Sequence, residues 1–126
     1  VELLKRLDLG LDTRLNAKVG LLSGGQRQAL TLLMATLTRP RLLLLDEPAA
    51  GMNPSETSEL MENIVKIRDT FQIAILLIEH DMSLVMGICE GICVLNYGKI
   101  IAKGTAAEIQ NNPVVIEAYL GKRKEQ

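Results

Sequence analysis

Two short apolar runs with a helical pattern between them dominate the middle of the chain. The first run covers Leu42 to Leu45 and the second covers Ile73 to Ile78. Continuous apolar runs of this length are typical of strands buried on both faces of a parallel sheet. The segment between them begins with the helix signals Asn53 and Pro54. The pattern therefore predicts two parallel strands joined by a helix, as a right-handed βαβ crossover.

Two helices in this region show different patterns. Ser23 with Gln26 three residues later forms a capping box that opens the upstream helix. Its residues Ala29 to Leu37 are apolar on nearly every face, so we expect most of this helix to be buried. The crossover helix between the two apolar runs is expected to expose one face to solvent. Its expected solvent-facing residues are Glu59, Glu62, Asn63 and Lys66.

The two ends of the chain carry shorter signals. Glu2 to Leu7 has the pattern of a helix that Gly10 stops. Runs at 92–95 and 99–102, around Asn96-Tyr97-Gly98, predict a β-hairpin. Thr105 with Glu108 forms another capping box, and a last helix follows. The fold class is therefore α/β: parallel buried strands with flanking helices, then a C-terminal hairpin and C-terminal helices.

Composition excludes several classes of protein. The length of 126 residues predicts one domain. A net charge of -1 and 2% aromatic residues argue against a nucleic-acid partner, which needs a basic field or stacking faces. Two cysteines and one histidine are too few for the usual metal cluster, so none is expected. No apolar run approaches the ~20 residues that span a bilayer.

The segment Leu22-Ser23-Gly24-Gly25-Gln26 is the first candidate site. Glycines at a helix N-terminus let a ligand approach bare backbone N–H groups, where the helix dipole favours an anion such as phosphate. The alternative is a plain capping box. Because glycine costs about 1 kcal/mol relative to alanine inside a helix, a purely structural reason for the pair Gly24 and Gly25 is weaker.

A second candidate lies where the two apolar runs end. Asp46 and Glu47 follow the first run, and His80 follows the second. The carboxyl ends of parallel strands meet at one edge, where ligands bind in open α/β folds. Asp46 is placed to hold Mg²⁺ directly or through water, Glu47 to polarise an attacking water, and His80 to reach a phosphate. Acids that merely end a strand, and a histidine in an ordinary loop, are the structural alternatives.

Together, these motifs and their order resemble the ATP-binding subunits of ABC transporters over essentially the whole chain. In that resemblance Leu22 to Gln26 looks like the ABC signature, and Leu42 to Glu47 looks like the Walker B strand with its catalytic Glu. Residues 50–53, with Gly51 and Asn53, look like the D-loop, and His80 looks like the switch histidine. The family implies ATP and Mg²⁺ as ligands, with Glu47 and His80 as catalytic residues. It implies nucleotide contacts from Ser23, Gly24, Gly25, Gln26, Asp46, Gly51 and Asn53.

The region from about residue 47 onward narrows the resemblance. The segments 47–54, 78–82 and 111–121 look like ATPases of branched-chain amino-acid importers. The stretch Val19 to Leu37 looks more like another importer group, so the chain is either mosaic or an unusual member. Asn53 also stands where many ABC ATPases have Asp.

The phosphate-binding pattern Gly-x-x-x-x-Gly-Lys-Ser/Thr is absent from the sequence. By the family's order it lies before Val1. The resemblance then implies that residues 1–126 are the carboxyl-terminal portion of one nucleotide-binding domain. Residues 1–40 belong to its helical subdomain and residues 41–126 to its catalytic core. With the P-loop strand missing, we expect an exposed edge and apolar face, self-association, and no ATPase activity of the chain alone.

The resemblance also implies partners and a location. A second nucleotide-binding domain pairs head to tail, and transmembrane permease subunits couple hydrolysis to transport. The protein is then peripheral, at the cytoplasmic face of the inner or plasma membrane. Two alternatives remain: a non-catalytic truncated, mosaic or designed fragment, and a soluble non-transport ABC ATPase.

Overall fold

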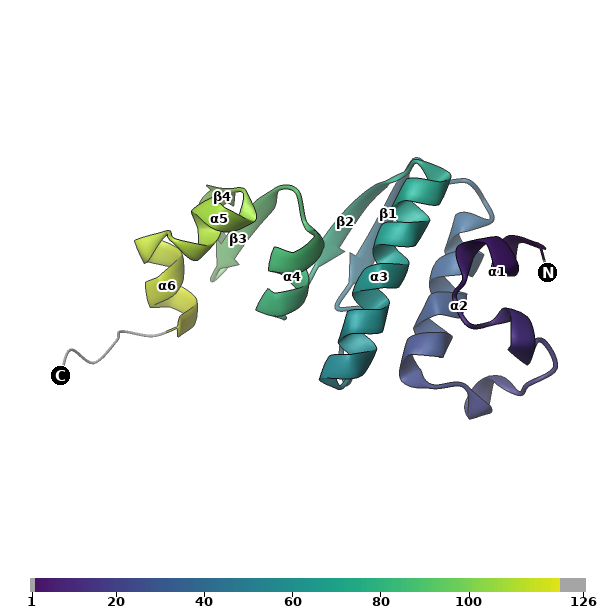
Figure 1. The fold of residues 1–126 in the computed structure, drawn as a ribbon. Helices are drawn as coiled ribbons and strands as arrows, with labels where there is room; N and C mark the ends of the chain where they lie inside the picture. Colours follow the sequence, from purple (N-terminus) through teal and green to yellow (C-terminus); the bar gives the residue numbers. More distant parts are fainter. Residues whose placement is uncertain (1, 121–126) are drawn as a thin grey trace. The chain divides into compact units, whose positions relative to one another are not determined.

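The predicted strand–helix–strand segment forms in the first of two compact units of the chain (Figure 1). The structure, a computed structural model, describes residues 2–120. Strand β1 (Leu42–Asp46) and strand β2 (Ala74–Ile78) pair in parallel, with Leu44 opposite Leu76. Helix α3 (Pro54–Phe71) connects them. It begins at the expected Asn53 and Pro54, and Asn53 also forms a capping box with Glu56. The α/β prediction and the parallel pairing are therefore confirmed.

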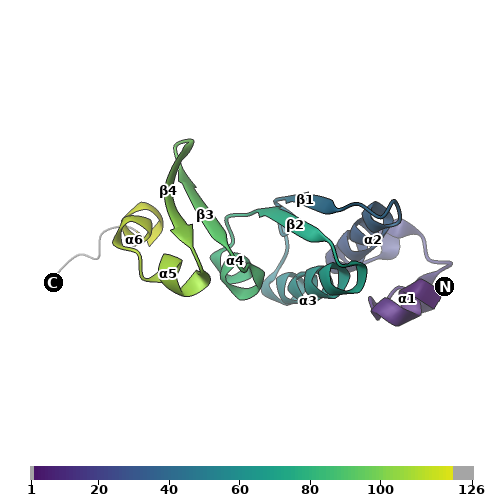
Figure 2. The ribbon, with the colours of Figure 1, turned by 90° about the horizontal axis from the view of Figure 1, so that it is seen from above.

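The prediction that both strands are buried on two faces was wrong. Leu43 and Leu45 are each 8% exposed, whereas Leu42 and Leu44 are each 57% exposed. On β2, Leu76 and Ile78 are exposed in the same alternation. The reason is that α3 covers one face of the pair (Figure 2), and no described helix of this part of the chain covers the other. The expected exposed apolar face is thus confirmed.

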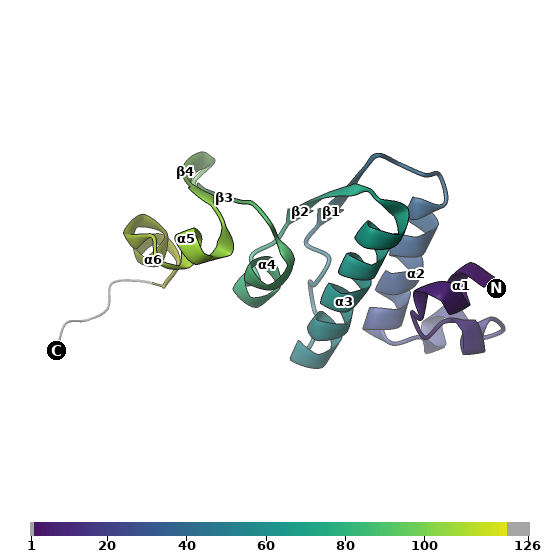
Figure 3. The same ribbon diagram turned by 45° about the horizontal axis from the view of Figure 1, so that its top comes forward.

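Helix α2 (Gly24–Thr36) packs beside α3 (Figure 3). Its Ser23–Gln26 capping box forms as predicted. The expectation that most of the helix is buried was wrong, because only the side toward α3 is covered and Met34 and Leu37 are exposed. Three short elements precede it: α1 (Glu2–Leu7), and the single 3₁₀ turns η1 (Asp12–Arg14) and η2 (Val19–Leu21).

One expected solvent-facing residue of α3 is buried. Asn63 is 3% exposed, whereas Glu59 and Glu62 are exposed as predicted. The Asn63 Nδ2 atom has no hydrogen-bond partner among the described residues. Neighbouring Lys66 is half-buried and donates from Nζ to the Asp8 carbonyl at 3.3 Å. The solvent-exposed face of α3 is narrower than predicted because α1 and α2 both contact this helix.

The C-terminal part of the chain forms a unit of its own. The compact units divide between Leu84 and Val85, within helix α4 (Met82–Ile88). The expected division at residue 40 separates a helical subdomain from a catalytic core and does not describe these compact units. That division stays a prediction. The second unit has the predicted hairpin, β3 (Ile92–Asn96) and β4 (Lys99–Gly104), in antiparallel pairing. Tyr97 and Gly98 both have positive φ, as its tight turn requires.

Two short helices complete the second unit. They are α5 (Ala106–Gln110) and α6 (Pro113–Leu120). Val94, Ala102, Ile109 and Val115 form their common core with the hairpin. The predicted Thr105–Glu108 capping box forms. Its hydrogen bonds from the Thr105 backbone N–H and then the hydroxyl hold the pKa of Glu108 below its ordinary value. Within residues 2–120, no helix is long and apolar enough to cross a bilayer.

Candidate functional site

The end of β1 leads into a tight, strained turn. The Glu47 N–H donates to the Ile78 carbonyl at 2.8 Å, which extends the pairing of the two strands by one residue. Glu47 itself has φ of 45°, a left-handed conformation that is uncommon for a residue with a side chain. The Ala50 N–H then donates to the Glu47 carbonyl at 3.1 Å and closes the turn. Non-glycine residues held in such conformations cluster at functional sites.

The structure brings Glu47 and His80 together as the sequence predicted. Nδ1 of His80 lies 3.5 Å from Oε1 of Glu47. The side chains are 73% and 57% exposed respectively, so both are open to a ligand. Asp46, the last residue of β1, is also exposed and stands opposite Ile78. All three residues therefore lie at the carboxyl edge of the strand pair.

Glu79 is a part of this edge to which the sequence analysis gave no role. Its side chain is 1% exposed. Oε1 accepts the Ala49 N–H at 2.8 Å, while Oε2 accepts the N–H groups of His80 at 2.9 Å and Asp81 at 3.1 Å. A buried carboxylate needs such donors, because an unpaired charge is costly to bury. The only sequence signal for a role of Glu79 was its position as an acidic residue directly after an apolar run.

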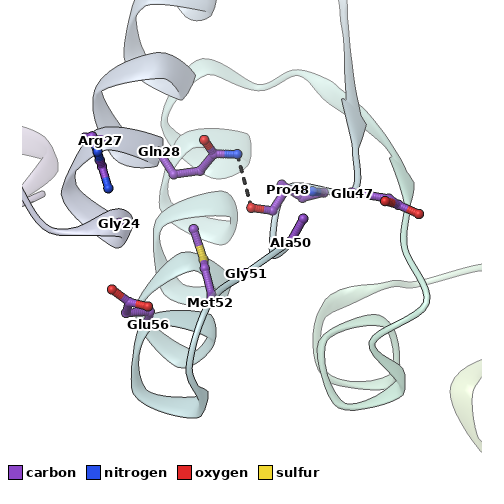
Figure 4. A pocket seen from close by; sticks show the side chains of 9 residues that line it. All are labelled: Gly24, Arg27, Gln28, Glu47, Pro48, Ala50, Gly51, Met52 and Glu56. Atoms are coloured by element: carbon purple, nitrogen blue, oxygen red, sulfur yellow. Dashed lines mark hydrogen bonds between the residues drawn. The ribbon is translucent and has the colours of Figure 1, made fainter.

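A pocket joins the start of α2 to the turn after β1. It is lined by Gly24, Arg27, Gln28, Glu47, Pro48, Ala50, Gly51, Met52 and Glu56. Figure 4 shows the Gln28 amide pointing at the Pro48 carbonyl, whereas the Glu47 carboxylate points the other way. The Gln28 Nε2 atom donates to that carbonyl at 3.2 Å. The two segments singled out in the sequence thus share one pocket, and Gln28 is the link that the sequence analysis missed.

The glycines of the first segment face carboxylates of α3. A Cβ added at Gly24 would lie 3.0 Å from Oε1 of Glu56, and one at Gly25 would lie 2.9 Å from Oε2 of Glu59. The first-turn N–H groups of a helix have no intrahelical acceptor and favour negative charge. Bare backbone at these positions therefore lets acidic groups come close. The same property suits a phosphate oxygen.

The other predicted nucleotide contacts have local structural roles. Ser23 Oγ accepts the Gln26 N–H at 3.1 Å, and Oε1 of Gln26 accepts the Ser23 N–H at 3.1 Å. Asn53 Oδ1 accepts the Glu56 N–H at 3.0 Å and caps α3. Gly51 has φ of 74°, which a residue without Cβ adopts at no cost. These residues fix the backbone at the start of α2 and in the segment that leads into α3.

The acidic residues at the strand edge allow a simple test for Mg²⁺. Among the described residues, no group of three or more His, Cys, Asp or Glu side chains is placed to hold a metal. Mg²⁺ takes only one or two carboxylates and completes its shell with water and phosphate oxygens. The exposed Asp46 fits that kind of shared site, in which a nucleotide supplies the remaining ligands.

Two family models match the chain. A model described as ABC transporter matches residues 1–50. A model described as branched-chain amino acid ATP-binding cassette transporter matches residues 99–125. The two matches support the resemblance to ABC transporter ATP-binding subunits, one near each end of the sequence.

Curated relatives match most of the chain. The chain is 50% identical over 106 residues to the high-affinity branched-chain amino acid transport ATP-binding protein BraF of Pseudomonas aeruginosa, covering 84% of this chain and 42% of BraF. It is 49% identical over 113 residues to LivG of Escherichia coli, a protein of the same description, covering 90% of this chain and 44% of LivG. The chain therefore spans less than half the length of these relatives.

Solved structures agree with these relatives. The ADP conformation of MJ1267, an ATP-binding cassette of an ABC transporter, superposes with a TM-score of 0.79 at 30% identity. That match covers 90% of this chain and 46% of MJ1267. CbiO1 from Clostridium perfringens, part of the ABC transporter complex CbiONQ, gives a TM-score of 0.76 at 29% identity, covering 92% of this chain and 48% of CbiO1.

Proposed function

Because the chain belongs to the ATP-binding proteins of ABC transporters, we propose that it forms the carboxyl-terminal part of an importer subunit. The solute that we propose is a branched-chain amino acid. The identity of 49% to LivG runs over 113 residues, so the stretch 19–37 falls inside the match. That supports one family origin for both halves of the sequence.

The observation that carries the proposal is the carboxyl edge of the strand pair, where Glu47 and His80 lie 3.5 Å apart and Asp46 is exposed. The start of α2, with Gly24 and Gly25, offers bare backbone for a phosphate that another subunit binds. Helix N-termini with bare backbone favour phosphate oxygens. A carboxylate at the edge of the strand pair is suited to polarise water, and phosphoryl transfer depends mainly on such positioning and charge stabilisation. This combination favours nucleotide hydrolysis over a purely structural role.

In this proposal each site residue has one task. Glu47 orients and polarises the attacking water, and His80 contacts the terminal phosphate. Asp46 holds Mg²⁺, which neutralises phosphate charge when it is bound with ATP. The further contacts to nucleotide come from Ser23, Gly24, Gly25, Gln26, Gly51 and Asn53.

The proposal includes a second subunit and a permease. Ser23 to Gln26 of one subunit closes on the phosphate bound by another, in a head-to-tail pair at the cytoplasmic face of the membrane. Ser23→Arg in the full-length protein places a long cation at the start of α2, so uptake of labelled leucine should be lost. Unchanged uptake would contradict the head-to-tail geometry. Ser58→Arg, at an exposed position of α3, is the matched control.

The chain alone is proposed to be inactive. A P-loop supplies most of the backbone donors for bound phosphate, and its pattern does not occur in the 126 residues. The purified chain should therefore fail to bind a fluorescent ATP analogue with Mg²⁺ up to millimolar concentration. This part of the proposal would be overturned by saturable binding of the analogue that unlabelled ATP displaces and that the substitution Asp46→Ala weakens.

The alternatives make different predictions. If the chain is a non-catalytic truncated, mosaic or designed fragment, supplying a P-loop-containing segment in cis or in trans restores no ATPase activity. If the full-length protein is a soluble ABC ATPase outside transport, it hydrolyses ATP without a permease partner and supports no uptake. The proposed importer subunit requires both hydrolysis and uptake, and both must fall together in Glu47→Gln.

A further inference from the structure

The buried carboxylate of Glu79 connects the two loops that carry Glu47 and His80. Ala49, whose N–H binds Oε1 at 2.8 Å, lies on the turn after β1. His80 and Asp81, whose N–H groups bind Oε2, lie on the loop after β2. One side chain therefore ties both loops at a fixed spacing. The 3.5 Å separation of Glu47 and His80 is measured across these same two loops.

The Pro48–Ala49 peptide group is held from both sides. Its carbonyl accepts the Gln28 amide at 3.2 Å, and its N–H donates to Glu79 at 2.8 Å. This peptide follows directly after Glu47, whose φ of 45° is sterically unfavourable. A strained conformation persists only where the surroundings over-determine it. The two hydrogen bonds supply that constraint next to the strained residue.

We propose that Glu79 is a positioning residue that sets the placement of Glu47 relative to His80, with Gln28 as its support from α2. The inference rests on the proposed ATPase function, since Glu47 and His80 act there. Glu79 is not a catalytic residue in this scheme, because its carboxylate is 1% exposed and its oxygens are occupied by backbone donors.

The hydrogen-bond pattern requires a carboxylate. Both oxygens accept, and the described donors approach each of them. A glutamine of the same shape offers one oxygen, and its NH₂ group would face an N–H donor on the other arm. Glu79→Gln therefore keeps the volume but releases one of the two loops. Ionised acceptors also give stronger hydrogen bonds than neutral ones, so the remaining arm weakens as well.

The test uses steady-state ATP hydrolysis by the full-length protein assembled with its permease. Glu79→Gln should lower kcat by roughly tenfold to a hundredfold, the scale expected when a reacting group is displaced by about 1 Å. KM for ATP should stay within about twofold, because nucleotide binding does not involve Glu79. Glu62→Gln, on the exposed face of α3, is the control and should match wild type. Gln28→Met should lower kcat in the same direction by a smaller factor.

Hydrogen exchange on the 126-residue chain supplies an independent readout. Glu79→Gln should speed exchange at the Ala49, His80 and Asp81 amides and leave the core amide of Leu60 unchanged. Faster exchange everywhere would mean that Glu79 only stabilises the fold, and would overturn the proposal. If Glu79→Gln fails to assemble, Gln28→Met carries the kinetic test, and wild-type kcat in that variant would overturn the proposal.

The outcomes separate this inference from the proposed function. An active wild-type protein with unchanged kcat in Glu79→Gln overturns the positioning role and leaves the ATPase proposal standing. An inactive wild-type protein overturns the ATPase proposal and the positioning role that depends on it.

Discussion

The imidazole Nδ1 of His80 lies 3.5 Å from Oε1 of Glu47, although the two residues come from different loops. The loops follow β1 and β2, whose parallel register places Asp46 opposite Ile78. Both side chains are largely exposed, so their contact contributes little to stability. Under the proposed function, the two side chains share one ligand, the bound nucleotide with its attacking water.

Replacing Glu47 tests that explanation. Glu47→Gln in the full-length protein should reduce ATP turnover by about 10²–10⁴-fold, the usual contribution of a general base. Nucleotide affinity should hold, and the free energy of unfolding should change by less than about 0.5 kcal/mol at this exposed position. Single-turnover hydrolysis and equilibrium binding measure the two effects. Near wild-type turnover would remove Glu47 from the mechanism.

The second prediction separates the two explanations for the glycine pair. Gly25→Ala should raise the free energy of unfolding of the chain by up to about 1 kcal/mol, through helix propensity. The atoms nearest to the new Cβ belong to the end of the exposed Glu59 side chain, which is free to swing away. ATPase activity of the full-length protein should nevertheless fall, because a methyl group then blocks the bare backbone.

Glu59→Ala provides the matched background for this variant. The stability gain of Gly25→Ala should be the same with and without the Glu59 carboxylate, measured by urea unfolding. A loss of stability in the wild-type background alone would show that the close approach at 2.9 Å is itself a packing requirement.

The third prediction concerns the exposed apolar face of β1 and β2. Leu44 and Leu76 are cross-strand neighbours on this face and are both exposed. Exposed apolar patches promote association, so we expect the chain to self-associate and Leu44→Thr to reduce this. Sedimentation equilibrium measures the shift. Leu43→Thr is the control on the opposite face; it should cost at least about 2 kcal/mol of stability, because Leu43 is buried.

The fourth prediction concerns the two cysteines, which the structure leaves as free thiols. Burial raises the pKa of the Cys89 thiol, whereas Cys93 is exposed. Because the thiolate is the reactive form, a raised pKa leaves less of it at pH 8. Iodoacetamide should therefore label Cys93 first, and mass spectrometry of the digested chain would follow the order. Equal rates at both cysteines would contradict the burial of Cys89.

Local sequence signals determined most of the secondary structure. The capping boxes at Ser23, Asn53 and Thr105 all form, because the cap and its partner are three residues apart and need no tertiary help. The turn at Tyr97 and Gly98 is also a local feature, since it depends on the positive φ of these two neighbouring residues. The order of the motifs also placed Glu47 and His80 at one edge, since parallel strands end on the same side.

Tertiary structure decided which faces are buried and what holds the site. The apolar runs 42–45 and 73–78 indicated strands covered on two sides, but burial depends on the elements available to cover them, and one face stays exposed. Asn63 was assigned to solvent by its polarity, although contacts from α1 and α2 cover that side of the helix. Glu79 joins the N–H groups of its neighbours His80 and Asp81 to that of Ala49, which lies 30 residues away, and only the folded chain brings Ala49 to the carboxylate.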